Sequence, residues 1–347
     1  MPVRFRIIRK GVEKGSDLAR LGLGNLYRNG NGVLPDLEKA NDLFDEALDN
    51  GCVEANYYKG IMVKNGLAGE DADANKALEL LDRVADSENP SFVAAAADLK
   101  GTICKNGYAG VEKDIDKALK YYNAAIEAYP FAEGYGNADI ASMYASEGET
   151  VREEEYYKKA LAFYETAAEE GNISAINTVG LYYRKGRGTE ADGEKAMDYY
   201  RKAADAGNYT AMDNIGIMYE NGYANVKKDM DKAYEWYKKA ADAGYADAMK
   251  NLGDLYYDGK YGAKDDEPDY NTARQWYEKA AENGYSGAYT SLGNMYKNGK
   301  GVEKDDEKAL DNYMKGVARG NSGAMNQVGI CYHDGIGVEK DYVQAME

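Results

Sequence analysis

Histidine and cysteine are scarce in this sequence of 347 residues, which contains one histidine and three cysteines. The number of cysteines is odd, and they lie far apart in the sequence, at Cys52, Cys104 and Cys331. We therefore expect no disulfide framework, which favours a reducing compartment. His333 has no cysteine or histidine at metal-ligand spacing, and as the only general base it would need partners that the sequence does not offer. We therefore interpret His333 as a solvent-exposed turn residue and expect no metal and no cofactor.

The common catalytic and nucleotide-binding motifs are also missing. The sequence has no C-x-x-C, H-E-x-x-H, G-x-S-x-G or S-x-x-K pattern and no phosphate-binding G-x-x-x-x-G-K-[ST] loop. Because no nucleophile or acid–base constellation is apparent, an enzyme is the least favoured class of protein.

Long hydrophobic runs are absent as well. Residues 1–10 are basic, but no apolar run follows them, so they do not predict a signal peptide. No stretch approaches the length of a membrane span, and membrane insertion is not expected. The sequence favours a cytoplasmic protein and leaves secretion by a non-classical route open.

Positive charge is in deficit, because 43 Lys and Arg face 60 Asp and Glu and give a net charge of −17. Such a chain would repel nucleic-acid backbones and anionic membranes, so we expect neither as a partner. The acidity either serves solubility alone or gives the chain a preference for basic protein partners.

What the sequence does contain is a repeat. The pattern L-G-x-x-Y-x-x-G, then an Asp, then K-A-x-x-[WY]-Y recurs nine times. Its central small residue falls at Gly24, Gly60, Gly101, Ala141, Gly180, Gly216, Gly253, Gly293 and Gly329, in steps of 36 to 41 residues. A period in this range is typical of stacked two-helix units, so we predict an all-α solenoid rather than one globular core.

The first helix of each unit carries the central glycine. Around Gly216, apolar residues such as Ala211, Ile215 and Tyr219 recur at three- and four-residue steps, and Gly222 ends the helix. A glycine inside a helix costs about 1 kcal/mol relative to alanine. Its recurrence therefore predicts that a neighbouring helix approaches too closely for a side chain to fit.

The second helix of each unit begins after an Asp that lies four residues before a small Ala. The Asp residues are Asp36, Asp73, Asp114, Asp192, Asp229, Asp269, Asp305 and Asp341. We interpret them as helix N-caps. A ladder of cation sites is the alternative, but one Asp per repeat, about 10 Å from the next, suits a cation poorly. Aromatic residues four positions after the Ala, such as Tyr237, are predicted to fill the space between helices.

The repeat A-x-x-x-L-G-x-x-Y-x-x-G-x-G-V-x-x-D-x-x-K-A-x-x-Y-Y-x-K-A-A-x-x-G resembles the Sel-one-like repeat, a relative of the tetratricopeptide repeat. Residues 293–320 match it nearly throughout, and the resemblance covers essentially the whole chain. It implies a right-handed α/α superhelix whose concave face binds proteins or peptides, as in adaptors and assembly scaffolds. Some bacterial relatives carry a disulfide in each repeat, and this chain lacks those cysteine pairs.

The pattern predicts one array over residues 1–347. It consists of a partial helix at 4–14, repeats 1–3 at 15–128, an irregular repeat 4 at 129–171, repeats 5–8 at 172–320 and a truncated repeat 9 at 321–347. Residues 129–158 should stack least regularly, because the G-x-G-V loop is missing and Tyr156 replaces the capping Asp. Either the chain is a fragment of a longer protein, or its blunt ends associate with other chains, including copies of itself.

If the first helices line the concave face, a polar groove should follow them. The candidate partner-binding residues are Asn177, Tyr182, Asn214, Met218, Asn251, Asp254 and Asn294. Asn side chains could clamp the backbone of an extended peptide, but Asn is also a tolerated polar residue on an exposed helix face. The leading hypothesis is a non-catalytic scaffold that binds a peptide or protein on this face. The alternative is a regulatory or structural module of a larger assembly or fusion, with partners at its uncapped ends.

Overall fold

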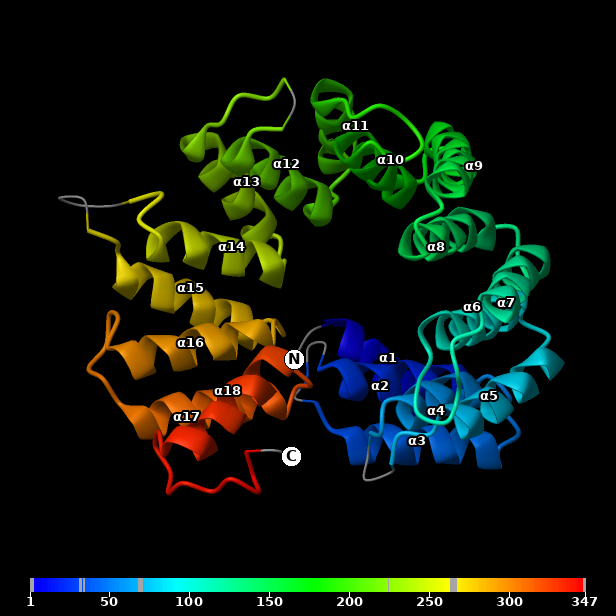
Figure 1. The fold of residues 1–347 in the computed structure, drawn as a ribbon, viewed down its shortest axis with the longest axis horizontal. Coiled ribbons are helices and arrows are strands. Elements are labelled where there is room, and N and C mark those ends of the chain that lie inside the picture. The colour runs from blue at the N-terminus through cyan, green and yellow to red at the C-terminus, as the bar shows by residue number, and fades with distance from the viewer. Residues whose placement is uncertain are drawn as a thin grey trace. The chain divides into compact units, whose positions relative to one another are not determined.

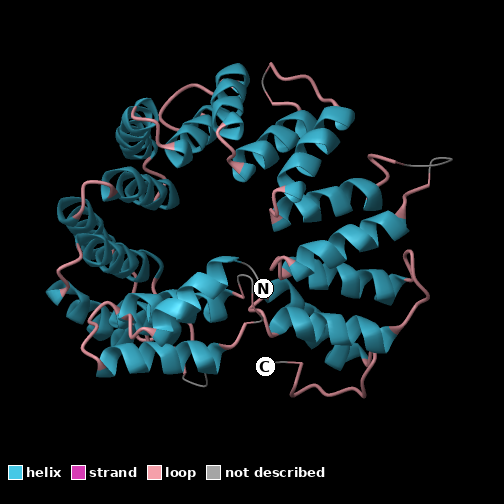
Figure 2. Ribbon diagram, turned by 180° about the vertical axis from the view of Figure 1, so that it is seen from behind, coloured by secondary structure: helices cyan, strands magenta, loops and turns pink. Residues whose placement is uncertain are grey.

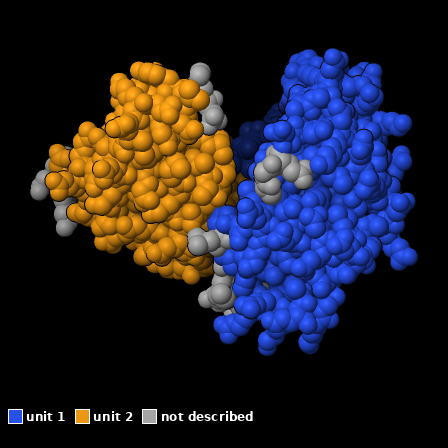
Figure 3. Space-filling view, turned by 90° about the horizontal axis from the view of Figure 1, so that it is seen from below, with its two compact units in different colours: residues 1–191 blue, residues 192–347 orange. Residues whose placement is uncertain are grey.

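The computed structural model describes residues 3–30, 33, 35–67, 71–223, 225–262 and 267–345. The chain divides into two compact units, residues 1–191 and residues 192–347 (Figure 3). Across these described ranges the regular structure consists of α-helices and one short 3₁₀ helix without any strand, which confirms the all-α prediction (Figure 2). None of the described helices has the length and apolar character that a membrane crossing requires.

The helices are labelled in chain order in Figure 1. Unit 1 contains α1 Val3–Glu13, α2 Asp17–Asn29, α3 Leu37–Asp49, α4 Ala55–Lys64, α5 Ala74–Arg83, the 3₁₀ helix Val84–Asp86, α6 Pro90–Asn106, α7 Ile115–Ala128, α8 Ala132–Ser146, α9 Thr150–Glu169 and α10 Ile173–Lys185. Unit 2 contains α11 Gly193–Asp205, α12 Tyr209–Asn221, α13 Met230–Asp242, α14 Ala246–Tyr257, α15 Tyr270–Glu282, α16 Gly287–Asn298, α17 Asp306–Val317 and α18 Ser322–Asp334. Even-numbered helices are the first helices of the predicted repeats, and odd-numbered helices from α3 onward are the second helices.

Five of the central glycines lie under aromatic rings of the paired second helices, namely Gly24, Gly101, Gly216, Gly253 and Gly293, whereas Gly60 lies under Leu81. A Cβ atom at Gly216 would lie 2.5 Å from the Tyr237 ring, and one at Gly101 would lie 2.7 Å from the Tyr122 ring. Both distances are far inside van der Waals contact, so no side chain fits. The predicted close approach is therefore confirmed, and the approaching group is a ring rather than a backbone.

Seven of the eight predicted Asp caps precede a helix, whereas the described residues after Asp341 form a turn. Each Asp side chain accepts a hydrogen bond from a backbone N–H in the first turn of the segment that follows it, as Asp36 does from Lys39 at 2.9 Å and Asp229 from Lys232 at 3.0 Å. The other six are Asp73, Asp114, Asp192, Asp269, Asp305 and Asp341. Each cap satisfies an orphan donor at the helix start and contributes about 1 kcal/mol.

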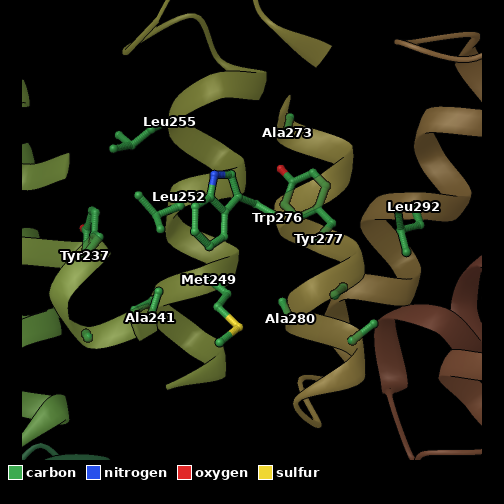
Figure 4. Close-up of a cluster of buried hydrophobic side chains, with 14 of the residues drawn as sticks. Tyr237, Ala241, Met249, Leu252, Leu255, Ala273, Trp276, Tyr277, Ala280 and Leu292 are labelled. Carbon is green, nitrogen blue, oxygen red and sulfur yellow. The ribbon is translucent and has the colours of Figure 1, made fainter. Parts of the chain in front are cut away.

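The core runs between neighbouring helices of each unit. Buried side chains of the second helices include Ala233, Ala273, Ala309, Tyr122, Tyr200, Tyr237 and Tyr313, all with no exposed surface. Figure 4 shows Trp276 and Tyr277 of α15 in one cluster with Met249 and Leu252 of α14. Burying such a side chain contributes about 1.5–3 kcal/mol, so each helix pair depends on its neighbours for stability.

Repeat 4 packs in a different register. The helix α9 has 20 residues and begins without a side-chain cap. Its Tyr164 ring lies over Gly134, where a Cβ would be 2.7 Å from the ring. The half-buried Tyr164 therefore departs from its fully buried counterparts. The finer partition of the array, including the partial helix at 4–14 and the truncated repeat at 321–347, stays a prediction.

Cys104 and His333 differ in their exposure to solvent. Cys104 is buried at 2% exposure, as expected for a packing residue. His333 lies in the last turn of α18 rather than in the turn after it, and its side chain is 65% exposed beside Asp334.

Candidate functional site

Polar side chains of the first helices in unit 2 join neighbouring repeats. The Asn251 amide on α14 donates to the Asp213 carboxylate on α12 at 2.9 Å. Asp213 is only 6% exposed, so this bond satisfies a buried charge. Asn251 therefore has a structural role, and its role in partner binding stays a prediction.

Two further candidates bind the hydroxyl groups of second-helix tyrosines. Tyr277 donates to Asp254 Oδ1 at 2.8 Å, and Tyr313 donates to Asn294 Oδ1 at 2.7 Å. Asp254 also pairs with Lys250 at 2.5 Å. Burial, followed by the charge and hydrogen bond of Asp254, raises the pKa of Tyr277, which keeps its hydroxyl a donor. The tyrosines thus span the space between the helices and end at a polar surface.

Tyr182 and Met218 were wrongly assigned to the partner-binding surface. Tyr182 is 3% exposed and Met218 is completely buried. The ring of Tyr182 packs against Tyr157 and Tyr164 of α9, with centroids 6.0 and 5.6 Å apart. The position two residues after the central small residue therefore faces a preceding second helix and belongs to the core.

The remaining candidates differ in exposure. Asn177 is half-buried on α10 in unit 1, whereas Asn214 on α12 in unit 2 is only 9% exposed. Asn251, Asp254 and Asn294 are half-buried on α14 and α16. Only these three of the five candidates in unit 2 therefore combine a polar group with substantial access to solvent.

Unit 1 contains a carboxyl pair that our sequence reading missed. Asp98 lies on α6 and Asp139 on α8, and both side chains are half-buried. Burial, the charge of Asp139 and a hydrogen bond with it raise the pKa of Asp98 to about 8. Burial also raises the pKa of Asp139, although its hydrogen bond with Asp98 and the charge of Lys105 act in the opposite direction. The pair therefore holds a proton at neutral pH.

The Asp98 carboxyl is incompletely paired. Its Oδ1 atom is sealed from solvent and has no hydrogen-bond partner among the described residues. The nearby cation Lys105 donates to the Ser142 hydroxyl at 2.8 Å instead. A buried acceptor without a partner costs about 1–3 kcal/mol.

Aromatic side chains lie on neighbouring first helices of the same unit. Tyr57 and Tyr58 of α4 and Phe92 of α6 form edge-to-face contacts with ring centroids 5.2 to 6.1 Å apart. Burial lowers the pKa of Arg28 on α2 while the neighbouring Tyr57 and Tyr58 raise it, and the guanidinium donates to Asn25 at 2.7 Å.

This arrangement suits recognition better than catalysis. A cationic side chain entering beside Asp98 would meet two carboxyl groups, and the aromatic rings offer apolar contact nearby. The described residues contain no group of three His, Cys, Asp or Glu side chains that could hold a metal ion.

The missed pair had a detectable signal. Asp98 and Asp139 lie three and two residues before the central small residues of consecutive repeats, and the spacing of Asp213 and Asn251 is the same. Aligning the repeats by that residue would have shown two acids where unit 2 has an acid and an amide.

Comparison with solved structures found several repeat proteins. The protective antigen c5321 of uropathogenic Escherichia coli, which displays an SLR fold, is 26% identical, with 99% of this chain and 85% of that chain covered and a TM-score of 0.47. A Sel1 repeat protein from Oxalobacter formigenes is 32% identical, with 60% and 81% covered and a TM-score of 0.46. The immunity protein Pa5087 from Pseudomonas aeruginosa is 16% identical, with 78% and 82% covered and a TM-score of 0.39. No curated protein matched the sequence.

The family model of the Sel1 repeat matches nine segments of this chain. They are residues 17–52, 53–89, 101–129, 148–172, 173–208, 210–245, 246–285, 286–321 and 322–347. The matches span most of the sequence and agree with the helix pairs and the glycine–ring contacts described above. The chain therefore belongs to the Sel1 repeat family, whose members are generally protein-interaction scaffolds and typically non-catalytic.

Proposed function

We propose that this chain is a non-catalytic protein-interaction scaffold that binds an extended, basic segment of a partner protein along the first helices of unit 1. In this proposal a Lys or Arg side chain of the partner enters beside Asp98 and Asp139. The observation that supports it most is the sealed, unpartnered Oδ1 atom of Asp98 next to a second carboxyl group.

The unbound protein carries an energetic cost at this site. Two carboxyl groups that share a proton in a partly buried site destabilise the fold, because neither ionises freely and one acceptor has no donor. A cation of the partner would supply donors and an opposite charge, and hydrogen bonds between charged groups are about twice as strong as neutral ones. Binding would therefore relieve a cost that the free chain carries.

The surroundings suit a peptide rather than a small cation. The rings of Tyr57, Tyr58 and Phe92 provide apolar contacts on neighbouring helices of the same unit. Aromatic anchors of this kind dominate the affinity of many protein interfaces. The net charge of −17 would in addition attract a basic segment over distances of about 10 Å at moderate ionic strength.

The test compares binding with stability. Affinity capture with the parent chain supplies a partner, and anisotropy with its labelled binding segment then compares the parent with Asp98→Asn and Asp139→Asn. We expect each substitution to weaken binding about tenfold, because a charge-assisted contact is lost, while thermal stability stays equal or rises. Asp116→Asn, at an exposed position of α7 in the same unit, is the matched control. Unchanged affinity in both variants would refute the proposed site.

The amide-bearing face of unit 2 remains part of the proposal as a second contact region. Asn251 and Asn294 each have one amide atom engaged inside the protein and a half-buried side chain. If they clamp a peptide backbone, changing Asn214, Asn251 and Asn294 together weakens saturable binding. Retention of the captured partner by the triple variant would exclude the amide groove.

A second candidate function is contact with an apolar helix of a larger assembly. The observation behind it is an apolar groove of about 840 Å³ on α17, α18 and residues 342–345. Met314, Met325 and Tyr342 line it and are 46, 49 and 58% exposed. We expect Met325→Glu to abolish an assembly that light scattering detects for the parent chain, and a parent that stays monomeric with its captured partner present would contradict this function.

A further inference from the structure

A cleft with a concentration of positive charge interrupts the acidic surface of unit 2. It has a volume of about 690 Å³ and lies between α11, residues 226–229 and the start of α13. Arg201, Lys227, Lys228 and Lys232 line it, against three acidic residues. In a chain with a net charge of −17, such a local excess of cations calls for a physical explanation.

The counterpart of this loop in unit 1 shows which side chains can hold such a loop against a helix. In the loop 107–114 the Ala109 carbonyl accepts from the Ala74 N–H at 3.0 Å, and the Gly110 carbonyl accepts from the Asn75 amide at 2.8 Å. These bonds hold that loop against the start of α5. A Cβ atom at Gly110 would lie 2.6 Å from the Asn75 amide nitrogen, so the contact requires glycine.

The loop 222–229 has the same pattern with two decisive differences. Counted from the capping Asp, Asn225 takes the position of Gly110, and Glu194 takes the position of Asn75. An ionised carboxylate has no hydrogen to donate, so Glu194 cannot form the bond that Asn75 forms. Glu194 instead lines the open cleft.

The charge of the loop is also reversed. Lys227 stands two residues before the cap, where the corresponding loops carry Glu112, Glu303 and Glu339. Lys228 matches Lys113, Lys304 and Lys340, so this loop presents two adjacent cations where the other three present an opposite pair. In the described part of the chain, neither Lys227 nor Lys228 has a carboxylate in salt-bridge range.

The two other cations are positioned around one ring. Arg201 donates to the Tyr219 hydroxyl at 3.3 Å, and Lys232 lies 5.3 Å from the centroid of the Tyr219 ring. Their acidic partners are neighbours on the same turn, Asp198 at 3.9 Å and Asp229 at 3.0 Å. Exposed pairs of this kind contribute little, about 0.2–1 kcal/mol, so an incoming carboxylate can compete with them.

We propose that this cleft binds an acidic segment of a protein partner, with Arg201 and Lys227 receiving a carboxylate group. The planar guanidinium of Arg201 suits bidentate binding of a carboxylate, and the Tyr219 ring, Met197 and Val226 offer apolar contact to the stem of a Glu side chain. The cleft lies in unit 2 and has the opposite charge preference from the Asp98–Asp139 site, so it adds a second recognition element to the scaffold.

Calorimetric titration of the full chain tests this proposal. The probe is an acetylated and amidated tetraglutamate, with tetraglutamine and inorganic phosphate as comparisons, at about 50 mM NaCl to limit screening. We expect the parent to bind tetraglutamate, with a roughly tenfold loss in Lys227→Glu and a roughly fivefold loss in Arg201→Gln, as for an exposed site that loses one or two charge contacts. Binding of tetraglutamine should stay below detection.

Two substitutions provide matched controls. Lys304→Glu makes the same charge change in the loop that precedes Asp305, and its binding should match that of the parent. Glu112→Lys gives the loop 107–114 the charge of the loop 222–229, but that loop is held against α5, so we expect no second site. Circular dichroism and tryptophan fluorescence verify folding. The proposal fails if tetraglutamate does not bind the parent, if Lys227→Glu and Arg201→Gln bind it normally, or if phosphate binds as tightly as the peptide.

Discussion

The same two positions of adjacent first helices carry an acid pair in unit 1 and an acid–amide pair in unit 2. Asp98 and Asp213 both lie three residues before the central glycine, and Asp139 and Asn251 both lie two residues before the central small residue of the next repeat. In unit 2 the Asn251 amide donates to Asp213 at 2.9 Å. In unit 1 Asp139 has no amide to donate, and Asp98 Oδ1 is left without a partner among the described residues.

Under the proposed function, the same scaffold position serves stability in unit 2 and recognition in unit 1. An amide donates a hydrogen bond to the buried acid and joins two repeats. A second acid cannot donate when ionised, so the buried carboxylate lacks a donor or an opposite charge. Local conflicts of this kind are expected where a protein has a functional reason to keep them. A single substitution in either unit, Asn251→Asp or Asp139→Asn, converts one kind of pair into the other.

The largest effect is expected for Asn251→Asp, which gives unit 2 the acid pair of unit 1. The Asp213 carboxylate would lose the Asn251 donor and gain a like charge in a site where it is only 6% exposed. We expect a loss of about 3 kcal/mol in the free energy of unfolding at alkaline pH, as for a broken buried charge contact. Trp236 and Trp276 both lie in unit 2, so urea unfolding followed by tryptophan fluorescence reports this change.

The pH dependence provides the internal control for that substitution. As the pH falls, protonation of the new pair replaces the lost donor and relieves the repulsion, so the deficit should shrink under acidic conditions. A deficit that is equal at acidic and alkaline pH would show that lost packing, and not charge, is responsible.

The reverse exchange, Asp139→Asn, should stabilise unit 1. Asp98 has a pKa of about 8 in the folded chain against an ordinary value of 3.8, so the folded chain holds a proton that the unfolded chain releases between these values. The stability of the parent therefore falls as the pH rises from about 4 to about 8, and the full penalty is present above pH 8. With an amide donor at position 139 the slope should flatten, with a gain of about 2 kcal/mol at pH 9.

Hydrogen exchange of the α6 and α8 amides measures this gain, because unit 1 contains no tryptophan. Asp116→Asn removes a carboxylate from an exposed position of the same unit and should leave the pH slope unchanged. If Asp139→Asn retains the slope of the parent, the acid pair is not its source.

Features governed by neighbours along the chain could be predicted from the sequence. Asp229 caps α13 because its donor, the Lys232 N–H, is three residues away, and the same local geometry recurs at the other Asp residues that precede a helix. A close approach at Gly216 could be predicted from the recurrence of the central glycine, because the cost of a helix glycine needs an offset. The approaching group is the Tyr237 ring, which the recurrence alone did not identify.

Features that depend on contacts between repeats were harder to predict. Met218 was placed on the surface because a single helix was considered, but a first helix is also covered by the second helix of a preceding repeat. The signal was present, since the position two after the central small residue is apolar and buried in every repeat, from Leu26 and Met62 to Cys331. The Asp98–Asp139 pair was missed for the same reason, because its members lie in different repeats.

The smallest expected effect is a difference in the stability that tyrosine hydroxyl groups contribute in the two units. Tyr277 donates to the charged Asp254 at 2.8 Å, whereas the Tyr122 hydroxyl contacts the neutral Thr102 hydroxyl at 3.3 Å. Hydrogen bonds to a charged group contribute about 1.5–3 kcal/mol and neutral ones about 0.5–1.5 kcal/mol. Tyr277→Phe should therefore cost about 1.5 kcal/mol and Tyr122→Phe about 0.5 kcal/mol, although both keep the ring over its glycine. Fluorescence-detected unfolding for Tyr277→Phe and hydrogen exchange for Tyr122→Phe provide the two values. Equal costs would mean that the charge of Asp254 adds nothing to the contribution of the Tyr277 hydroxyl.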